Sequence, residues 1–389
     1  MHTAIPLQIR WHSAMAEVNR TEWDRLAQPL GTPLLEWRWL HSMEASDSIA
    51  PRAGWHPRHL TVWRNERLVG AAPLYIKTHS NGEFVFDQWW ARLAAEAGIA
   101  YYPKLVGMSP VTPAAGYRFL TDPSADGIQI QETMLSAMDA LCMRMGLSGC
   151  HLLFVDPDWQ ATLPLDRFAA WRHQSYLWRN AGYGNFEDYL ACFKSSQRRN
   201  IRRERRQMAD QGIVFRALSG DDLTPGLART MYRYYVNTND QYGPWGCRYL
   251  NADFFKEVFD QYGHRLLVIS AERPDGRDRP LALAMLLHKQ RHLIGRYWGC
   301  ERPFRDLHFN MCFYEPIQWA IAQGIQTFDP GAGSPHKIQR GFKAVANTSL
   351  HRFHEPRLRQ LFARLIGRIN QAEQENIDTL NTLLPFAVR

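Results

Sequence analysis

The densest group of chemically reactive side chains lies between His292 and Lys343. Transfer of an acyl group to an amine requires a base that frees the amine, a site for the oxyanion and cations that neutralise a departing carrier. The candidate bases in this group are Glu315, His336, Glu301 and Asp329. The candidate substrate ligands are Lys337, Arg340, Tyr297 and Trp298.

The loop Gly331 to Gly333 directly follows Asp329, at the predicted end of a strand. Ligands of α/β sheets lie outside the carboxyl ends of strands, so this loop is the first choice for the active site. If the segment after Pro335 is helical, Lys337 and Arg340 lie one turn apart and place two cations beside the loop amides. An ordinary turn explains the glycines equally well, and a solvated surface explains the cations.

A second polar group lies in the first half of the chain, where Lys77, His79 and Glu83 are candidate contacts to a polar ligand. Aromatic residues mixed with charged ones are typical of a concave binding site. The neighbouring pairs Trp89-Trp90 and Tyr101-Tyr102 are more typical of a core or an interface.

The segment 194–206 is unusually basic, with seven basic residues and one acidic residue. It contains good helix formers and no proline or glycine, which predicts a helix with guanidinium groups on nearly every side. A polyphosphate ligand would relieve the repulsion between these charges, so we expect phosphate contacts from Arg198, Arg199, Arg202 and Arg203. A solvated helix is the alternative interpretation.

The elements that must position these residues follow a repeated order. Apolar runs at 58–63 and 68–77 predict a β-hairpin, and so do those at 265–271 and 281–288. In each half, an amphipathic helix, a glycine and a strand ending in Asp-Pro come next. These helices and strands are 127–145, 151–155, 309–321 and 325–328. The order predicts that 58–157 and 265–330 are two copies of one α/β unit, and an amphipathic helix is expected at about 356–384.

Composition limits the alternatives. At 389 residues the chain exceeds what one core usually organises, so two domains are expected, and the net charge of +8 favours phosphate-bearing partners. The six cysteines lack metal-site spacing, which predicts no metal. Polar residues interrupt the N-terminus and the longest apolar run is only Leu281 to Leu287, so we expect a cytoplasmic protein.

Several motifs carry a resemblance to a known family. Residues 296–343, with RYWG, FYEPIQWAIAQG, FDPGAG and HKIQRGF, resemble the second domain of the FemA/FemB/FemX-like acyltransferases. From about residue 10 to 355, motifs such as LVGAAPLYIKTHSNGEFVFD, PVTPAAG and RRNIRRER resemble the FemAB-like predicted N-acyltransferases, often labelled peptidoglycan biosynthesis or recognition proteins.

The resemblance implies an α/β fold of tandem GNAT-like domains, each with a mixed, mostly antiparallel sheet flanked by helices. The expected domains are 1–193 and 213–389, the second including the terminal amphipathic helix, with the basic helix 194–212 at their junction. No bound cofactor is expected. FemA-type relatives transfer from aminoacyl-tRNA to a lipid- or nucleotide-linked muropeptide, which makes tRNA a candidate partner.

The chain departs from these relatives because it has no long helical arm for tRNA. It also lacks the pyrophosphate loop that ordinary GNAT enzymes use for coenzyme A, so acyl-CoA is an open but unsupported donor. The main alternative is a non-catalytic protein whose basic helix binds RNA or an anionic membrane surface, including peripheral association with the inner membrane face. A serine hydrolase is disfavoured because no G-x-S-x-G elbow is present.

Overall fold

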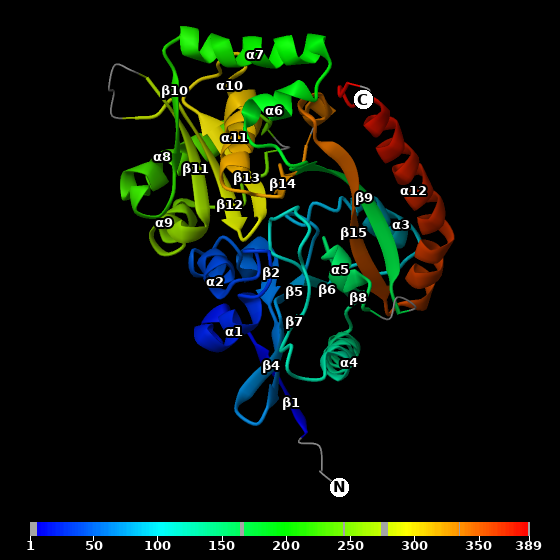
Figure 1. Ribbon diagram of the computed structural model, residues 1–389. Coiled ribbons are helices and arrows are strands. Elements are labelled where there is room, and N and C mark those ends of the chain that lie inside the picture. The colour runs from blue at the N-terminus through cyan, green and yellow to red at the C-terminus, as the bar shows by residue number, and fades with distance from the viewer. Residues whose placement is uncertain (1–5, 164–166, 244–245, 274–278, 334, 388–389) are drawn as a thin grey trace. The chain divides into compact units, whose positions relative to one another are not determined.

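The computed structural model describes residues 6–163, 167–243, 246–273, 279–333 and 335–387 (Figure 1). The chain forms two compact units: unit 1 comprises 1–173 and 346–374, and unit 2 comprises 174–345 and 375–389. Strands β9 (Ala169–Arg179) and β15 (Lys343–Phe353) and helix α12 (Pro356–Thr382) contribute residues to both units. Each predicted domain is one continuous segment of the chain, whereas each compact unit is built from two separate segments. The domain boundaries stay a prediction.

The sheet of unit 2 has the strand order β10-β11-β12-β13-β14-β9. The strands are β10 (Val214–Leu218), β11 (Leu266–Glu272), β12 (Ala282–Lys289), β13 (His292–Cys300) and β14 (Thr327–Asp329). Strands β10 to β13 pair antiparallel, and β14 pairs parallel to β13. The predicted hairpin is therefore confirmed as β11 and β12, and the predicted strand 325–328 begins later and includes Asp329.

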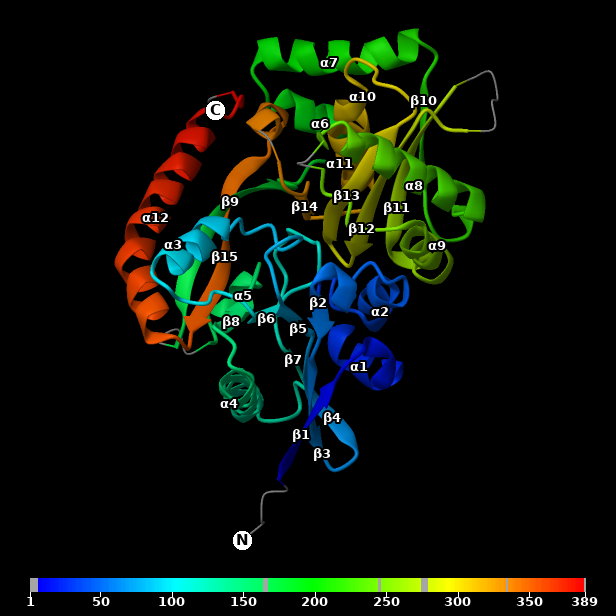
Figure 2. The same ribbon diagram turned by 180° about the vertical axis from the view of Figure 1, so that it is seen from behind.

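Helices cover both faces of this sheet. Comparison of Figures 1 and 2 shows α10 (Leu307–Phe309) and α11 (Glu315–Ala322) on one face and α8 (Pro225–Asp240) and α9 (Ala252–Gln261) on the other. A π-helical turn, Asn310–Tyr314, joins α10 to α11. Helices α6 (Phe186–Ala191) and α7 (Ser195–Asp210) pack on the α11 side.

The basic helix α7 is not basic on every side. Ile201, Glu204 and Met208 are buried along one face, at the spacing of successive helical turns. The expectation of guanidinium groups all round is therefore wrong, because the three-to-four-residue period turns these side chains inward against the core of unit 2.

Unit 1 contains two sheets, with strand orders β1-β3-β4-β7 and β15-β8-β6-β5-β2. Their remaining strands are β1 (Leu7–His12), β2 (Trp55–Pro57), β3 (His59–Arg64), β4 (Arg67–Ala72), β5 (Leu74–Lys77), β6 (Lys104–Gly107), β7 (Leu120–Thr121) and β8 (Gly149–Leu152). The helices are α1 (Arg20–Ala27), α2 (Trp37–Ala45), α3 (Gln88–Glu96), α4 (Gly127–Met145) and α5 (Pro157–Gln160). The helix predicted at 127–145 and the hairpin β3–β4 are confirmed.

The predicted repeat is only partly correct. In unit 1, β8 follows α4 and pairs parallel to β6, as β14 follows α11 and pairs parallel to β13 in unit 2. The hairpins differ, because β3–β4 and β8 lie in separate sheets whereas β11–β12 and β14 share one. Pro73 separates β4 from β5 and has no N–H to donate, which interrupts the ladder at the point where the chain changes sheet. The predicted strand 151–155 also ends early, since Phe154 adopts a left-handed φ of 52°.

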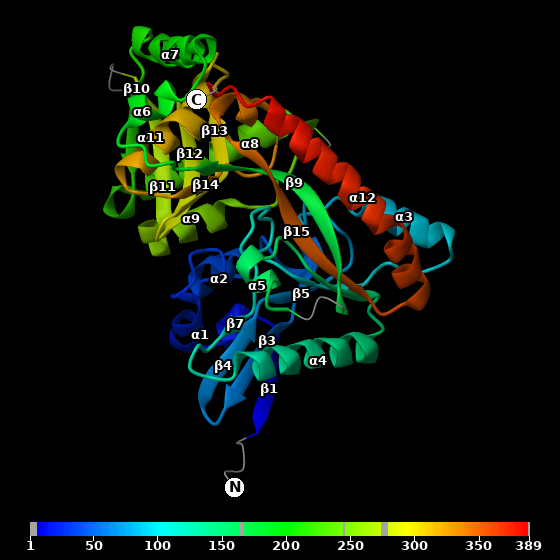
Figure 3. The same cartoon turned by 45° about the vertical axis from the view of Figure 1, so that its right-hand side comes forward.

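Both units contain antiparallel strands followed by a helix and a strand parallel to the last of them, so the fold is a tandem GNAT-like α/β fold. Figure 3 shows α3 beside the first part of α12, where Trp90, Trp171 and Phe362 share a buried cluster in unit 1. The terminal helix expected at 356–384 is thus confirmed as α12. Among the described residues, no helix combines the length and the apolarity that crossing a membrane requires.

Candidate functional site

The loop after β14 is held in place by hydrogen bonds from its own backbone and from Lys337. The Gly331 N–H donates to Asp329 Oδ1 at 2.8 Å, and Lys337 Nζ donates to the carbonyls of Gly331 and Ala332 at 2.6 and 2.9 Å. Gly331 and Gly333 have φ values of 79° and 128°, which side chains with a Cβ rarely adopt. Asp329 and Lys337 are thus brought together at one loop, as the sequence predicts.

The carboxyl group of Asp329 and the amine of Lys337 both have pKa values displaced toward neutrality. Burial raises the pKa of Asp329 to about 6, opposed by the Gly331 hydrogen bond and by the positive charges of Lys337 and Arg296. Burial lowers the pKa of Lys337 to about 8, opposed by the negative charge of Asp329. A carboxylate and an ammonium with such pKa values can exchange protons with a substrate near neutral pH.

Arg340 does not lie beside the loop as a second free cation. It belongs to the 335–340 turn, a 3-10 helix from Pro335 to Arg340, and its guanidinium binds Glu204 of α7 at 3.1 Å. Both side chains are about 95% buried. The Arg340 guanidinium also lies 3.4 Å from the ring centroid of Phe309.

The other three candidate bases lie outside the loop contacts. Glu315 binds Arg205 at 3.1 Å, and burial raises the pKa of its carboxyl group. His336 and Glu301 are exposed. Of the four candidates, Asp329 is therefore the one that accepts a hydrogen bond from the loop, through the N–H of Gly331.

Tyr297 and Trp298 point to opposite faces of β13, because successive residues of a strand alternate. Tyr297 packs against Tyr235 of α8, with ring centroids 5.2 Å apart. Trp298 packs against His308 of α10, at 4.6 Å. Burial, reinforced by the positive charges of Arg340 and Lys337, lowers the pKa of His308 to about 4. Because Trp298 packs against His308, it lies on the same side of β13 as these cations, whereas Tyr297 lies on the other side.

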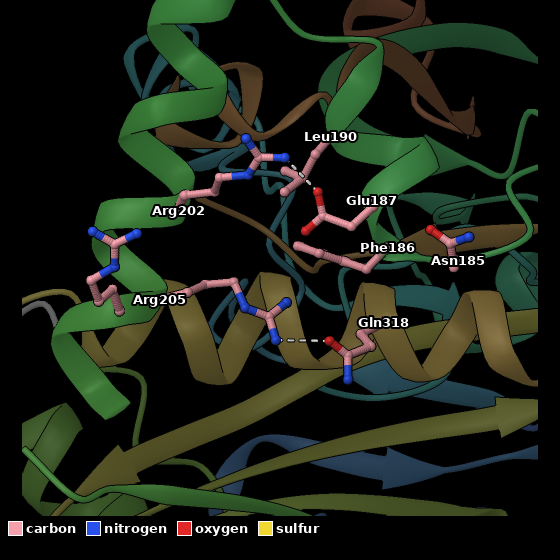
Figure 4. Close-up of a pocket in the computed structure, with 8 residues that line it drawn as sticks. Asn185, Phe186, Glu187, Leu190, Arg202, Arg205 and Gln318 are labelled. Atoms are coloured by element: carbon pink, nitrogen blue, oxygen red, sulfur yellow. Dashed lines mark hydrogen bonds and ion pairs between the residues drawn. The ribbon is translucent and has the colours of Figure 1, made fainter. Parts of the chain in front are cut away.

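The arginines of α7 border a pocket of about 490 Å³, which we call the arginine pocket (Figure 4). Arg202 binds Glu187 of α6 at 2.6 Å, and Arg205 binds Gln318 of α11 at 2.7 Å. The lining residues are Asn185, Phe186, Glu187, Leu190, Arg202, Arg205, Arg206 and Gln318. Of the four predicted phosphate ligands, only Arg202 lines this pocket.

The other three predicted ligands lie elsewhere on α7. Arg198 donates to the carbonyl of Ala191 at 3.4 Å, Arg203 donates to Asn200, and Arg199 is exposed. Arg205 and Arg206 were missed by the sequence-based choice. The spacing of Ile201 and Met208 in the sequence indicates the inward face of α7 and therefore which arginines flank it. That spacing is the signal that points to Arg205 and Arg206.

The polar group of unit 1 is a buried ion-pair cluster centred on Lys104. Its ammonium binds Glu83 Oε2 and Asp87 Oδ2, each at 2.6 Å, and Ser80 Oγ at 3.1 Å. The three charged side chains are at most 1% exposed. Although burial lowers it, the two carboxylates raise the pKa of Lys104 above its ordinary value. Burial raises the pKa of Glu83 to about 7.

Lys77 and His79 lie beside this cluster. Lys77 Nζ is 3.6 Å from the ring centroid of Trp55 and donates to the carbonyl of Asn81 at 3.2 Å. Burial lowers the pKa of Lys77 to about 7. His79 is half-buried and accepts the N–H of Asn81 at 3.2 Å. The structure therefore groups Lys77 and Glu83 in one buried region.

One group of potential metal ligands occurs in the described part of the chain, formed by Asp139, Cys150 and His354. Arg352 already neutralises Asp139, at 2.8 Å. The expectation of no metal stays a prediction.

The fold places this protein in the class of tandem GNAT-like α/β proteins, and in this chain an arginine-lined pocket lies between α6, α7 and α11. The chain belongs to the FemAB-like family, described as peptidoglycan biosynthesis/recognition, whose model matches residues 14–388. No curated protein matches the sequence.

Solved structures share this fold at low sequence identity. FemX is 12% identical, with a TM-score of 0.55 over 91% of this chain and 99% of its own. A conserved protein of unknown function from Bacteroides thetaiotaomicron is 10% identical, with a TM-score of 0.53 over 89% of this chain and 100% of its own. L-PGS from Bacillus licheniformis is 10% identical, with a TM-score of 0.51 over 90% of this chain and 98% of its own.

The family and the shared fold support, at family level, a transferase of acyl or aminoacyl groups related to the cell wall. At the same level, they imply an aminoacyl-tRNA or another activated donor and a peptidoglycan precursor as acceptor.

Proposed function

We propose that this protein is an N-acyltransferase that moves an acyl or aminoacyl group from a phosphate-bearing carrier to the amine of a cell-wall precursor. The observation that carries the proposal is that Asp329, at the carboxyl end of β14, and Lys337 both bind the backbone of the loop that follows β14. Membership of the FemAB-like family supports the reaction class.

The proposed reaction begins when Asp329 accepts a proton from the acceptor ammonium. The freed amine nitrogen attacks the donor carbonyl carbon, forming the new C–N bond and a tetrahedral oxyanion. The attacking nitrogen loses its extra proton, the oxyanion collapses, and the bond to the carrier breaks with its electron pair going to the carrier oxygen or sulfur, which takes up that proton. Asp329 then releases to solvent the proton that it accepted from the ammonium. Lys337 holds the loop by its carbonyls and supplies positive charge beside the reacting centre. Glu315, His336 and Glu301 are the alternative bases. Trp298 is on the face of β13 that packs against His308 of α10.

The carrier phosphates are assigned to the arginine pocket and to the exposed arginines of α7. Guanidinium groups bind phosphate oxygens in pairs and keep their charge at any physiological pH. Because Arg202 and Arg205 are held by Glu187, Glu315 and Gln318, they are pre-positioned before a ligand arrives.

The direct test is a transfer assay followed by mass spectrometry. The purified protein is incubated with aminoacyl-tRNA or with acyl-CoA, each with amine-bearing muropeptide precursors. A mass increase of the acceptor equal to the acyl group supports the proposal and identifies the donor. Absence of transfer from both donor classes, with the protein shown to be folded and its copurifying ligands identified and tried, would contradict it.

The pH dependence of kcat is expected to be bell-shaped. Below about pH 6, Asp329 becomes protonated and cannot accept the proton of the amine, so the rate falls. Above about pH 8, Lys337 loses its positive charge and the rate falls again. Measuring kcat from pH 5 to 9 at saturating donor and acceptor checks both limbs. A flat profile across this range would remove Asp329 and Lys337 from the chemistry.

Replacing Arg202 and Arg206 with glutamine is expected to weaken carrier binding and its dependence on salt. Each lost phosphate contact should reduce the slope of log K against log salt by about one unit. The matched control replaces Arg229 and Arg233, which are also exposed and one turn apart, on α8. Equal slopes in both double variants would leave the α7 arginines as a solvated surface.

A second candidate function is a binding protein without turnover, which the exposed Arg199, Arg203 and Arg206 favour. In that case binding to RNA or to vesicles containing anionic lipid survives changes at Glu315 and His336 and disappears with the arginines. The transfer assay separates the two functions. If transfer occurs but unit 2 variants leave it unchanged, Lys77, His79 and Glu83 are the next residues to replace.

A further inference from the structure

The inward face of α7 carries a charged residue whose contacts extend well beyond its own helix. Glu204 is buried and accepts hydrogen bonds from Arg340, Asn200 and the Tyr314 hydroxyl. Its backbone carbonyl accepts from Asn310 Nδ2 at 3.2 Å. All of these contacts lie within unit 2.

The π-helical turn meets Glu204 at both of its ends, through Asn310 and Tyr314. A π-helix inserts an extra residue into a helix, costs regularity and often occurs at functional sites. Here the irregular turn brings two polar side chains to one carboxylate and one carbonyl of α7. The helix that leads to Glu315 is therefore fastened to the helix that carries the arginines.

The 335–340 turn is fastened to α7 at two further points. Arg340 reaches Glu204 at 3.1 Å, and Gln197 Nε2 donates to the carbonyl of Gln339 at 2.7 Å. The Arg340 guanidinium also donates to the carbonyl of His336 at 2.9 Å, which fixes the turn internally. The same turn carries Lys337, whose ammonium holds the carbonyls of Gly331 and Ala332.

A chain of contacts thus links α7 to the loop after Asp329. Glu204 binds Arg340, Arg340 binds the His336 carbonyl within the turn, and the next residue, Lys337, binds the carbonyls of Gly331 and Ala332. Stability alone does not explain the buried ion pair, because apolar side chains of similar volume often replace such pairs without loss. A directional pair instead fixes the relative position of the two elements that it joins, and here one guanidinium nitrogen of Arg340 reaches both carboxylate oxygens of Glu204, at 3.3 and 3.1 Å.

We propose that Glu204 is a positioning residue that ties the arginine-bearing helix α7 to the 335–340 turn and so sets the place of Lys337 and of the loop behind it. This inference rests on the proposed function for its effect on catalysis. Its structural part, the placement of Lys337, can be tested without any turnover.

The test compares Glu204→Gln with wild type in the full-length protein. A misplaced catalytic loop is expected to lower kcat by about 100-fold, while the dissociation constant of the donor stays within about twofold. Trace labelling of Lys337 with acetic anhydride across pH, read by mass spectrometry, gives the pKa of its amine. Freed from its buried position, Lys337 should titrate about one pH unit or more higher than in wild type.

The control for general destabilisation is Asp122→Asn in unit 1. Asp122 is as buried as Glu204 and also binds arginine, since it accepts from Arg25 and Arg67 at 2.9 Å each. This variant should unfold at a lower temperature without changing kcat or the labelling of Lys337. If Glu204→Gln does not fold, Glu204→Asp, which keeps the charge and shortens the reach, replaces it.

The outcomes are distinguishable. A higher labelling pKa of Lys337 together with a lower kcat supports the positioning role. A folded Glu204→Gln variant with a lower melting temperature but unchanged Lys337 labelling and kcat overturns it. If wild type transfers no acyl group, the proposed function fails, and the labelling result still decides whether Glu204 places Lys337.

Discussion

Asp329→Asn is expected to lower kcat for acyl transfer by about 100- to 10,000-fold at neutral pH, the usual effect of losing a general base. Asparagine has nearly the same shape, and its side-chain oxygen can still accept the Gly331 N–H, so the loop should keep its conformation. What disappears is the capacity to take up a proton. Donor and acceptor binding should change little, because the substitution removes basicity rather than a binding surface.

Steady-state kinetics with the donor identified by the transfer assay measure this effect. Glu301→Gln is an informative companion, because Glu301 is an exposed carboxylate at the end of the neighbouring strand β13 and is another of the candidate bases. If Asp329→Asn retains a kcat within about threefold of wild type, the base lies elsewhere, and Glu315→Gln and His336→Ala become the decisive variants.

Lys104→Met is expected to cost about 3–5 kcal/mol of unfolding free energy at neutral pH. The substitution leaves Glu83 and Asp87 buried without their shared ammonium, and breaking a buried pair has this order of cost. Chemical denaturation followed by circular dichroism measures the loss. The matched control is Lys256→Met on α9, where the lysine is exposed and the change should stay within about 0.5 kcal/mol.

The deficit of the Lys104→Met variant should also depend on pH. Without the lysine, the folded-state pKa of Glu83, already raised by burial, rises further, and that of Asp87 rises above its unfolded value, so the unfolded state releases protons more readily. Stability relative to wild type should therefore fall as pH rises from about 5 to 8 and recover on acidification. A variant as stable as wild type at pH 8 would show that water or another group already compensates the two carboxylates.

Local patterns in the sequence predicted the fold well, because they report local physics. The apolar periodicity of 127–145 and the hairpin runs depend only on neighbouring residues, and α4, β3–β4 and β11–β12 follow them closely. The hairpin's change of sheet at Pro73 could not be predicted, since the partner strands are chosen by tertiary packing.

The site was predicted in part for the same reason. Asp329, the glycines and Lys337 are close in sequence, and their loop forms as expected. Arg340 and Glu204 are separated by 136 positions, so nothing in the local sequence shows that the arginine is already neutralised. Composition alone does not show how the arginines are distributed on α7, because that distribution depends on the inward positions that Ile201 and Met208 define.

The routing of the chain has a consequence for how the protein can be divided. Because β15 lies between 343 and 353 but pairs with β8 at 149–152, unit 1 obtains one of its strands from late in the sequence. A fragment that ends near residue 193 would present β8 with an unpaired edge, and such an edge invites aggregation. Unit 2 likewise takes β9 from residues that precede its own helices. During synthesis, unit 1 therefore cannot complete its sheet until residues 343–353 have been made, long after the rest of its strands.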